Sequence, residues 1–266
     1  MNKLRQLIPQ NEKTARIGAF YQQQIIPWLD VLALFLWGTL FIRYRFTGEL
    51  RLLIHPNYFN LVLAAGLVFL AMSGMRLGHL LQNKQIQLPQ GQHITLFPPG
   101  FGTGLLTLVA ILAFIIPPRV LTSEVALQRG VRESLPVTQV ETQTFYTDVK
   151  PEERNLVEWV RTLNAYPEPD AYSELPVDVT GFVIHLPNLP EDYLFLARFV
   201  ITCCAVDASP VGFPVLLPST RDQFPQDTWL EVQGEMMTAS LDGERRLVIQ
   251  ATDIKKIPTP DDPYAF

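Results

Sequence analysis

The sequence predicts a membrane protein in two parts: an α-helical N-terminal part with three spans and an α+β, mainly β C-terminal domain. Three long apolar runs all lie within the first 122 residues, and five strand-like runs all follow residue 170. The charge divides at the same place, with +7 over residues 1–122 and −12 over residues 123–266. We therefore assign residues 1–122 to a transmembrane domain, 123–145 to a polar connector and 146–266 to a β-rich domain.

Each apolar run is long enough to cross a bilayer, since roughly 20 helical residues span a hydrocarbon core of about 30 Å. Residues 58–75 and 94–118 contain no charge, and Ile25–Ile42 contains only Asp30. We expect spans at about 25–45, 58–81 and 96–117. Asp30 is interpreted as a solvated helix end, with a functional intramembrane acid as the alternative. The first run is expected to be a retained anchor, because no small-residue cleavage site follows it.

Basic residues in the short loops predict the orientation, because Lys and Arg stay on the cytoplasmic side. The N-terminal tail and the loop between the second and third runs carry six of them, and the loop between the first two runs carries three. We expect a multi-pass protein of the cell (plasma) membrane. Its N-terminus is expected in the cytoplasm and its C-terminal domain outside the cytoplasm.

The C-terminal half predicts one helix and five strands. Leu156, Val157, Trp159, Val160 and Leu163 repeat at helical spacing after an acidic, proline-containing start at 148–153. The expected strands cover residues 177–186, 193–203, 211–217, 229–236 and 247–254, and Asp242-Gly243 predicts a hairpin. This pattern favours an OB-like five-stranded barrel with one helix, and a β-sandwich is the alternative.

Composition and motifs exclude several function classes. The acidic charge of the β-rich domain argues against nucleic acid as a partner, because phosphate backbones are bound mainly by Lys and Arg. The sequence contains no Gly-x-Gly-x-x-Gly, no Gly-x-x-x-x-Gly-Lys and no Gly-x-Ser-x-Gly motif. Neither an ATPase nor a serine hydrolase is therefore supported.

The two cysteines of the chain, Cys203 and Cys204, are adjacent, and Asp207 follows three residues later. One interpretation is packing, because free cysteine is a small hydrophobe and neighbouring strand residues face opposite sides. A second is metal binding through two sulfurs and one oxygen, although adjacent side chains chelate zinc poorly and a further ligand would be needed. A third is a strained vicinal disulfide. The Cys-x-x-Cys spacing of thioredoxin-like enzymes is absent.

Three segments of the β-rich half carry a family resemblance: Gly181-Phe182-Val183, the stretch RFVITCCAVDASPVG from Arg198 to Gly212, and Trp229. Together with the N-terminal spans, they make the chain similar to the YcgQ-type family of proposed permease subunits. The resemblance implies a multi-span permease encoded as a neighbour as the partner, beside the lipid bilayer itself.

The resemblance implies a noncatalytic accessory subunit of a two-component permease, whose outer β-domain binds or presents cargo. The alternative is a membrane-tethered thiol-redox or metal-dependent enzyme that uses the Cys-Cys-x-x-Asp motif. We expect no enzymatic activity. The hypothesised binding residues are Cys203, Cys204, Asp207 and Arg198. The first three are also candidate metal ligands. The sequence does not identify a cofactor, and a metal ion is one candidate.

Overall fold

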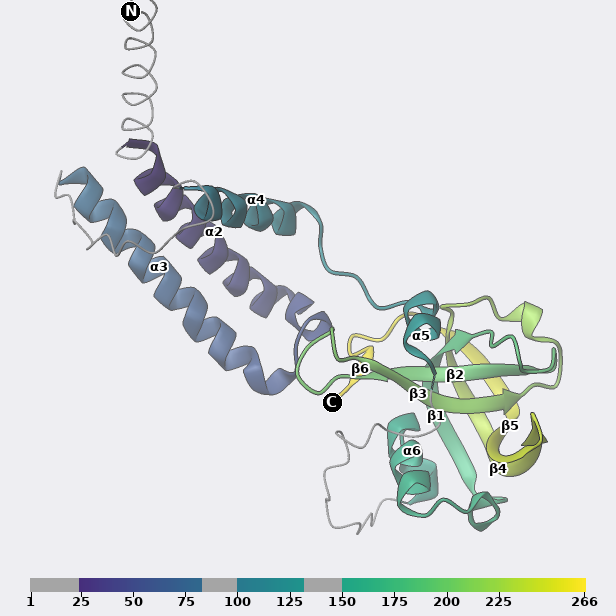
Figure 1. Cartoon of the computed structure of the whole chain (residues 1–266). Helices are drawn as coiled ribbons and strands as arrows, with labels where there is room; N and C mark the ends of the chain where they lie inside the picture. Colours follow the sequence, from purple (N-terminus) through teal and green to yellow (C-terminus); the bar gives the residue numbers. More distant parts are fainter. Residues whose placement is uncertain (1–23, 83–99, 132–149) are drawn as a thin grey trace, which may run out of the picture. The chain divides into compact units, whose positions relative to one another are not determined.

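The computed structural model describes residues 24–82, 100–131 and 150–266 (Figure 1). They divide into two compact units. The helical unit contains the described residues up to Leu50 and those from Asn57 to Pro118, whereas the β unit contains Arg51–Pro56 and Arg119–Phe266. The N-terminal tail, the loop between the second and third apolar runs and residues 132–145 of the predicted connector lie outside the described residues.

Within the described residues, the helical unit contains three helices: α2 (Ile26–Thr47), α3 (Phe59–Leu81) and α4 (Phe101–Ile115). α3 runs antiparallel to α2, since Ser73 near the end of α3 donates to the Val31 carbonyl near the start of α2. At Gly38 the two helices are in close contact, because a Cβ there would lie 2.9 Å from the carbonyl oxygen of Gly66. Small residues allow such close approach of apolar helices.

Two helices of this unit, Ile26–Thr47 and Pro56–Leu81, are long and apolar enough to cross a membrane by length and composition. α4 is apolar but has only 15 residues. The first two predicted spans thus coincide with long apolar helices. The third predicted span forms a shorter helix, because Gly100 with φ 84° precedes it and Ile116 adopts an extended conformation at its end.

The β unit is built on a six-stranded mixed sheet with the strand order β1-β4-β5-β3-β2-β6. Its strands are β1 (Pro176–Ile184), β2 (Tyr193–Val200), β3 (Ser209–Leu216), β4 (Trp229–Leu241), β5 (Glu244–Ile257) and β6 (Tyr264–Ala265). β1 pairs antiparallel with both β4 and β2, and β3 pairs parallel with β5. The sixth strand was not predicted, because two residues are too few to show an alternating pattern.

The predicted hairpin is confirmed and is longer than expected. β4 and β5 pair from Trp229↔Ile257 to Leu241↔Glu244, so Asp242-Gly243 is a two-residue turn. Both turn residues have positive φ, 52° for Asp242 and 79° for Gly243, as this turn requires. The short 3₁₀ segments within the described residues are Glu49–Leu52, Pro56–Tyr58, Pro151–Glu153, Pro169–Tyr172 and Arg221–Gln223.

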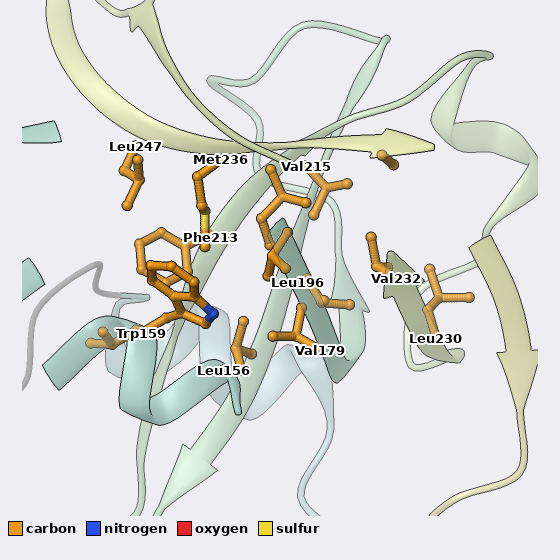
Figure 2. Packing of buried hydrophobic residues seen from close by; sticks show 14 of the residues in the cluster. Leu156, Trp159, Val179, Leu196, Phe213, Val215, Leu230, Val232, Met236 and Leu247 are labelled. Carbon is orange, nitrogen blue, oxygen red and sulfur yellow. The ribbon is translucent and has the colours of Figure 1, made fainter. Parts of the chain in front are cut away.

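The predicted amphipathic helix is α6 (Leu156–Ala165). It begins later than the acidic start suggested, because Asn155 caps it: its side chain accepts from the backbone of Glu158, whose carboxylate accepts from the Asn155 backbone. Its apolar face closes one hydrophobic cluster of the β unit. Figure 2 shows Trp159 and Leu156 pointing toward strand residues that include Phe213 and Val179.

A second hydrophobic cluster contains four aromatic rings that contact one another in the order Trp229–Phe182–Phe199–Tyr264, with 5.3 Å between the ring centroids of Phe182 and Phe199. It also contains the fully buried Ala126 of α5 (Ser123–Arg129). α5 lies in the segment predicted to be a polar connector. Its seven residues are too few to show a helical repeat, so only the tertiary packing reveals it.

Candidate functional site

The two cysteines lie in the Cys loop, which we define as residues 201–208 between β2 and β3. The sequence predicted a strand up to Cys203, but β2 ends at Val200. The strand ends early because the Asp207 carboxylate accepts the backbone N–H groups of Thr202 at 3.2 Å and Cys203 at 2.7 Å. These amides are therefore directed into the loop and not to a neighbouring strand. Asp207 also donates its own N–H to the Cys204 carbonyl at 3.0 Å, which closes the turn.

The two sulfur atoms are reduced and lie side by side. The Sγ atoms of Cys203 and Cys204 are 3.6 Å apart, within the range of a weak thiol–thiol hydrogen bond. Cys203 is exposed and Cys204 is half-buried. The packing interpretation thus does not apply to Cys203, whose side chain is at the surface of the domain.

Asp207 also controls the protonation of Cys203. The hydrogen bond from the thiol to Asp207, followed by the contact with Cys204, raises the pKa of Cys203 to about 12. Burial alone would raise the pKa of the Asp207 carboxyl, but hydrogen bonds from the Cys203 thiol and from the backbone of Cys203 and Thr202 hold it below its ordinary value. The stable state at neutral pH is therefore a neutral thiol beside a carboxylate.

The segment Arg51–Pro56 is hydrogen-bonded to the Cys loop, although about 150 residues separate them in the sequence. The His55 N–H donates to the Cys203 carbonyl at 3.0 Å, and the Ala205 N–H donates to the Leu53 carbonyl at 2.8 Å. Ile54 and Cys204 thus form an antiparallel bridge. No local pattern in the sequence signals this pairing, because a single bridge leaves no alternation of apolar residues.

Two arginines fix the surroundings of the loop. Arg129 at the end of α5 donates to the carbonyls of Ala208 at 2.6 Å and Ala205 at 3.1 Å. Arg51 pairs with the Asp262 carboxylate at 2.8 Å and so ties the segment Arg51–Pro56 to the C-terminal stretch. Sequence reasoning missed both residues, since each acts through a partner that is distant in the chain.

Arg198 occupies a different environment from the cysteines. Its guanidinium donates to Thr180 Oγ1 at 3.4 Å and to the Asp262 carbonyl, and it lies over the Trp229 ring at 5.9 Å from the centroid. Burial lowers the pKa of Arg198, and Asp262 partly opposes this. Asp262, whose carbonyl accepts from Arg198, also pairs through its carboxylate with Arg51, and this links Arg198 to the segment that contacts the Cys loop.

The structure thus brings Cys203, Cys204 and Asp207 together, as the sequence suggested. The Arg198 side chain contacts other residues, namely Thr180, Trp229 and Asp262. Within residues 24–82, 100–131 and 150–266, no group of three or more His, Cys, Asp or Glu side chains is arranged to hold a metal ion. Cys203 would also have to lose its proton against the Asp207 carboxylate before it could ligate a metal. Metal binding by these three residues stays a prediction.

Asp30 is the other carboxylate that the sequence singled out. One of its oxygens pairs with Arg76 of α3 at 2.8 Å, and the other accepts from Thr103 of α4 at 2.8 Å. The predicted solvated helix end is therefore a contact between three helices. This arrangement satisfies the carboxylate internally and accounts for its position without a catalytic role.

Glycine is required at position 212 of the Cys-containing stretch for a structural reason. A Cβ at this position would lie 1.9 Å from the carbonyl oxygen of Leu196, so β3 can approach β2 only with glycine here. β2 and β3 bracket the Cys loop and pair from Tyr193↔Leu216 to Val200↔Ser209. The glycine therefore belongs to the scaffold that positions the loop.

These features define a class of protein: an apolar helical unit joined to a mixed β domain that displays two adjacent thiols next to a carboxylate. The chain belongs to the DUF1980 family, since residues 29–132 match the DUF1980 N-terminal domain and residues 137–266 match the DUF1980 C-terminal domain. It is similar to the UPF0703 protein YcgQ of Bacillus subtilis (strain 168), with 26% identity over 103 residues. That match covers 38% of this chain and 36% of the YcgQ protein.

Proposed function

We propose that this chain is a noncatalytic subunit of a two-component membrane permease. In this proposal the helical unit anchors the protein and contacts a multi-span partner, while the β unit presents the Cys loop to cargo. The apolar helices α2 and α3 and the exposed Cys203 support the proposal.

One observation favours binding over catalysis: the Cys203 thiol donates to Asp207 and has its pKa raised to about 12. Cysteine nucleophiles act as thiolates and lie in environments that lower the thiol pKa, such as those next to Lys, Arg or protonated His. The environment of Cys203 does the opposite. Its thiol suits recognition of a ligand more than attack on a substrate.

The alternative, a membrane-tethered thiol-redox or metal-dependent enzyme, has one observation in its favour. The two sulfurs are 3.6 Å apart and one is exposed, so a small oxidant or a thiophilic ion has access to the pair. A metal ion is accordingly the candidate cargo or cofactor. Because Cys203 must lose its proton to ligate, such binding should strengthen as the pH rises.

We further propose that the β unit is a closed, OB-like barrel. The pairings β1-β4-β5-β3-β2 return to β1 through the register Phe182↔Ala197 to Ile184↔Phe195, which supports closure. The parallel pair β3–β5 also matches the antiparallel-with-one-parallel pattern expected of a five-stranded Greek-key barrel. The sixth strand, β6, would then lie outside the closed circuit, beside β2.

We also propose three membrane crossings, with the β unit outside the cytoplasm. α4 runs parallel to α2: Thr103 contacts Asp30 near the start of both helices, and the Tyr44 hydroxyl donates to the Ala113 carbonyl near their ends. If α2 crosses the membrane, α4 crosses in the same direction. The segment that follows α2, Arg51–Pro56, belongs to the β unit, and so does the chain after α4. The chain after α2 and the chain after α4 must then lie on the same side of the membrane. If α2 crosses once, the number of crossings before residue 119 is therefore odd.

The α4 helix itself is about 22 Å long, shorter than the usual hydrocarbon core. Apolar sequence continues on both sides of it, from Ile94 to Pro118. The orientation is tested with a reporter that fluoresces only in the cytoplasm, fused after Phe266, which should remain dark. A bright reporter would reverse the proposed orientation.

The function itself is tested by purifying the full chain in mild detergent from cells that also make the neighbouring multi-span protein. A stoichiometric complex of the two is expected. A matched pair of variants, Cys203→Ser and Asn188→Ser, then separates loop function from general surface change, because Asn188 is an exposed loop residue of the same domain. Loss of transport with an intact complex in Cys203→Ser alone supports the proposal. Turnover by the isolated chain, with no complex formed, would establish the enzyme alternative.

A further inference from the structure

The peptide between Cys203 and Cys204 takes part in a hydrogen bond to the segment Arg51–Pro56 and also links two thiols that lie close enough to react. The two roles place conflicting demands on its geometry. Its carbonyl, that of Cys203, accepts the His55 N–H at 3.0 Å, and its two side chains place their sulfurs 3.6 Å apart. The first role requires a planar, correctly oriented peptide. The second makes the pair a site for a vicinal disulfide.

A vicinal disulfide requires this peptide to deform. Adjacent Cα atoms across a trans peptide are about 3.8 Å apart, whereas disulfides ordinarily bridge Cα atoms at roughly 4.4–6.8 Å. Closing the ring therefore rotates or twists the peptide and turns the Cys203 carbonyl away from its position in the reduced loop. The hydrogen bond from His55 depends on that position, and the bond from Ala205 to Leu53 lies directly beside it.

We propose that Cys203 and Cys204 form a reversible redox site whose oxidation to a vicinal disulfide releases the segment Arg51–Pro56 from the Cys loop. Coupling is reciprocal: the pairing that oxidation breaks also stabilises the reduced dithiol. The redox state of the two thiols is thereby linked to the pairing of a segment that joins the ends of α2 and α3. This holds whichever partner or cargo the protein has.

The chemistry balances with a small-molecule disulfide as the oxidant. The thiolate of one cysteine attacks the oxidant, breaking its S–S bond and releasing one thiolate, so that a mixed disulfide forms. The second cysteine loses its proton and attacks the protein sulfur of the mixed disulfide, which forms the Cys203–Cys204 bond and releases the second thiolate. The two protons from the cysteines end on the two released thiols, and the two electrons reduce the oxidant.

Asp207 affects the chemical step separately from the pairing. It accepts the hydrogen bond of the Cys203 thiol, so it favours the reduced form and slows loss of that proton. Its substitution changes the redox equilibrium even where the segment Arg51–Pro56 stays paired. A test of the link between oxidation and pairing must therefore change the hydrogen bond from the His55 N–H to the Cys203 carbonyl and leave Asp207 intact.

The first experiment uses the full chain in detergent, with reduced and oxidised glutathione as the redox probe. After acid quenching and alkylation, mass spectrometry reports the fraction of protein with a Cys203–Cys204 disulfide. Amide hydrogen exchange of the peptide spanning residues 51–56 is then compared between the two forms. We expect at least tenfold faster exchange in the oxidised form, and no effect of oxidised glutathione in the double variant Cys203→Ser/Cys204→Ser, which has no thiol to oxidise.

The second experiment uses a matched pair of variants. His55→Pro removes the backbone donor, whereas His55→Ala keeps the donor and removes the ring, which contacts Phe266 at 5.2 Å between centroids. Loss of the donor should favour the disulfide about tenfold, which is a reduction potential about 30 mV more negative in His55→Pro than in His55→Ala.

Either of two results overturns the proposal. Equal exchange of residues 51–56 in the reduced and oxidised chains would show that oxidation leaves the pairing intact. A glutathione titration that yields only mixed or intermolecular disulfides would show that the two thiols do not form the vicinal bond. The exchange measurement uses the unsubstituted chain, so the test does not depend on the folding of His55→Pro.

Discussion

Two carboxylates, Asp30 in the helical unit and Asp207 in the β unit, are both fully engaged, but with different kinds of partner. Asp30 contacts the side chains of Arg76 and Thr103 on two other helices. Asp207 contacts backbone amides of its own loop and one thiol, that of Cys203. Side-chain partners on separate helices make Asp30 a packing contact. Because its partners are backbone amides within one loop, Asp207 determines the conformation of that loop. In this conformation the Cys203 thiol is exposed at the surface.

The largest expected effect concerns the reactivity of this thiol. In a Cys204→Ser background Cys203 is the only thiol of the chain. Its alkylation by iodoacetamide should rise with pH only at strongly alkaline values, because the carboxylate raises the pKa of Cys203. Adding Asp207→Asn should accelerate alkylation at about pH 8 on the order of a hundredfold, since each pKa unit changes the thiolate fraction tenfold.

The control for this measurement is Asp192→Asn, which removes an exposed carboxylate of the same domain outside the loop. It should leave the alkylation rate unchanged. Equal rates with and without the Asp207→Asn substitution would mean that the reactivity of the Cys203 thiol does not depend on the carboxylate. The proposed difference between Asp207 and Asp30 would then be wrong.

The second effect is on loop stability. Asp207→Ala removes the acceptor of two backbone amides and of the thiol, so the opening free energy of the Cys loop should fall by about 2–3 kcal/mol. Hydrogen exchange of the amides of Thr202 and Cys203 measures it directly. Asp207→Asn keeps one carbonyl acceptor and should show a smaller loss. An unchanged exchange rate in the alanine variant would remove Asp207 as the organiser of the loop.

The fold could be predicted from sequence wherever a periodic pattern was long enough. The two long apolar helices, α6 and the Asp242-Gly243 hairpin all left local signals, and the structure has them. α5 and β6 left none, because seven and two residues carry less than two full repeats of their patterns. Their positions depend on tertiary burial, for example that of Ala126 and Tyr264.

The site was predictable only within one stretch of chain. Cys203, Cys204 and Asp207 are close in sequence, and proximity in sequence kept them together. The partners that complete their environment, His55 and Arg129, bind through backbone atoms or to backbone atoms. Such contacts place little demand on residue type, so a single sequence carries no sign of them.

The third effect is the pH dependence of Cys loop stability, which should follow the titration of Asp207. The hydrogen bonds hold the pKa of Asp207 below its unfolded value of 3.8, so the carboxylate stabilises the loop at any pH above that value. The stabilisation should be lost as the pH falls below about 4 and through the lower folded pKa. Exchange of the Cys203 amide, corrected for the intrinsic rate, should follow this profile. The Asp207→Asn variant should show no such transition, and a wild-type profile that is flat to about pH 2 would contradict the assignment.

The smallest effect belongs to Asp30. The pair with Arg76 has an N–O distance of 2.8 Å, but the side chains are 28% and 39% exposed, so solvent weakens their attraction. A double-mutant cycle of Asp30→Asn and Arg76→Gln, read from thermal unfolding of the full chain in detergent, should give a coupling of about 0.5–1 kcal/mol. Neither substitution should change Cys203 alkylation. A coupling above about 3 kcal/mol would mean that the pair is desolvated as a buried ion pair is, and the Asp30 cluster would then have to be treated as an intramembrane site and not as a packing contact.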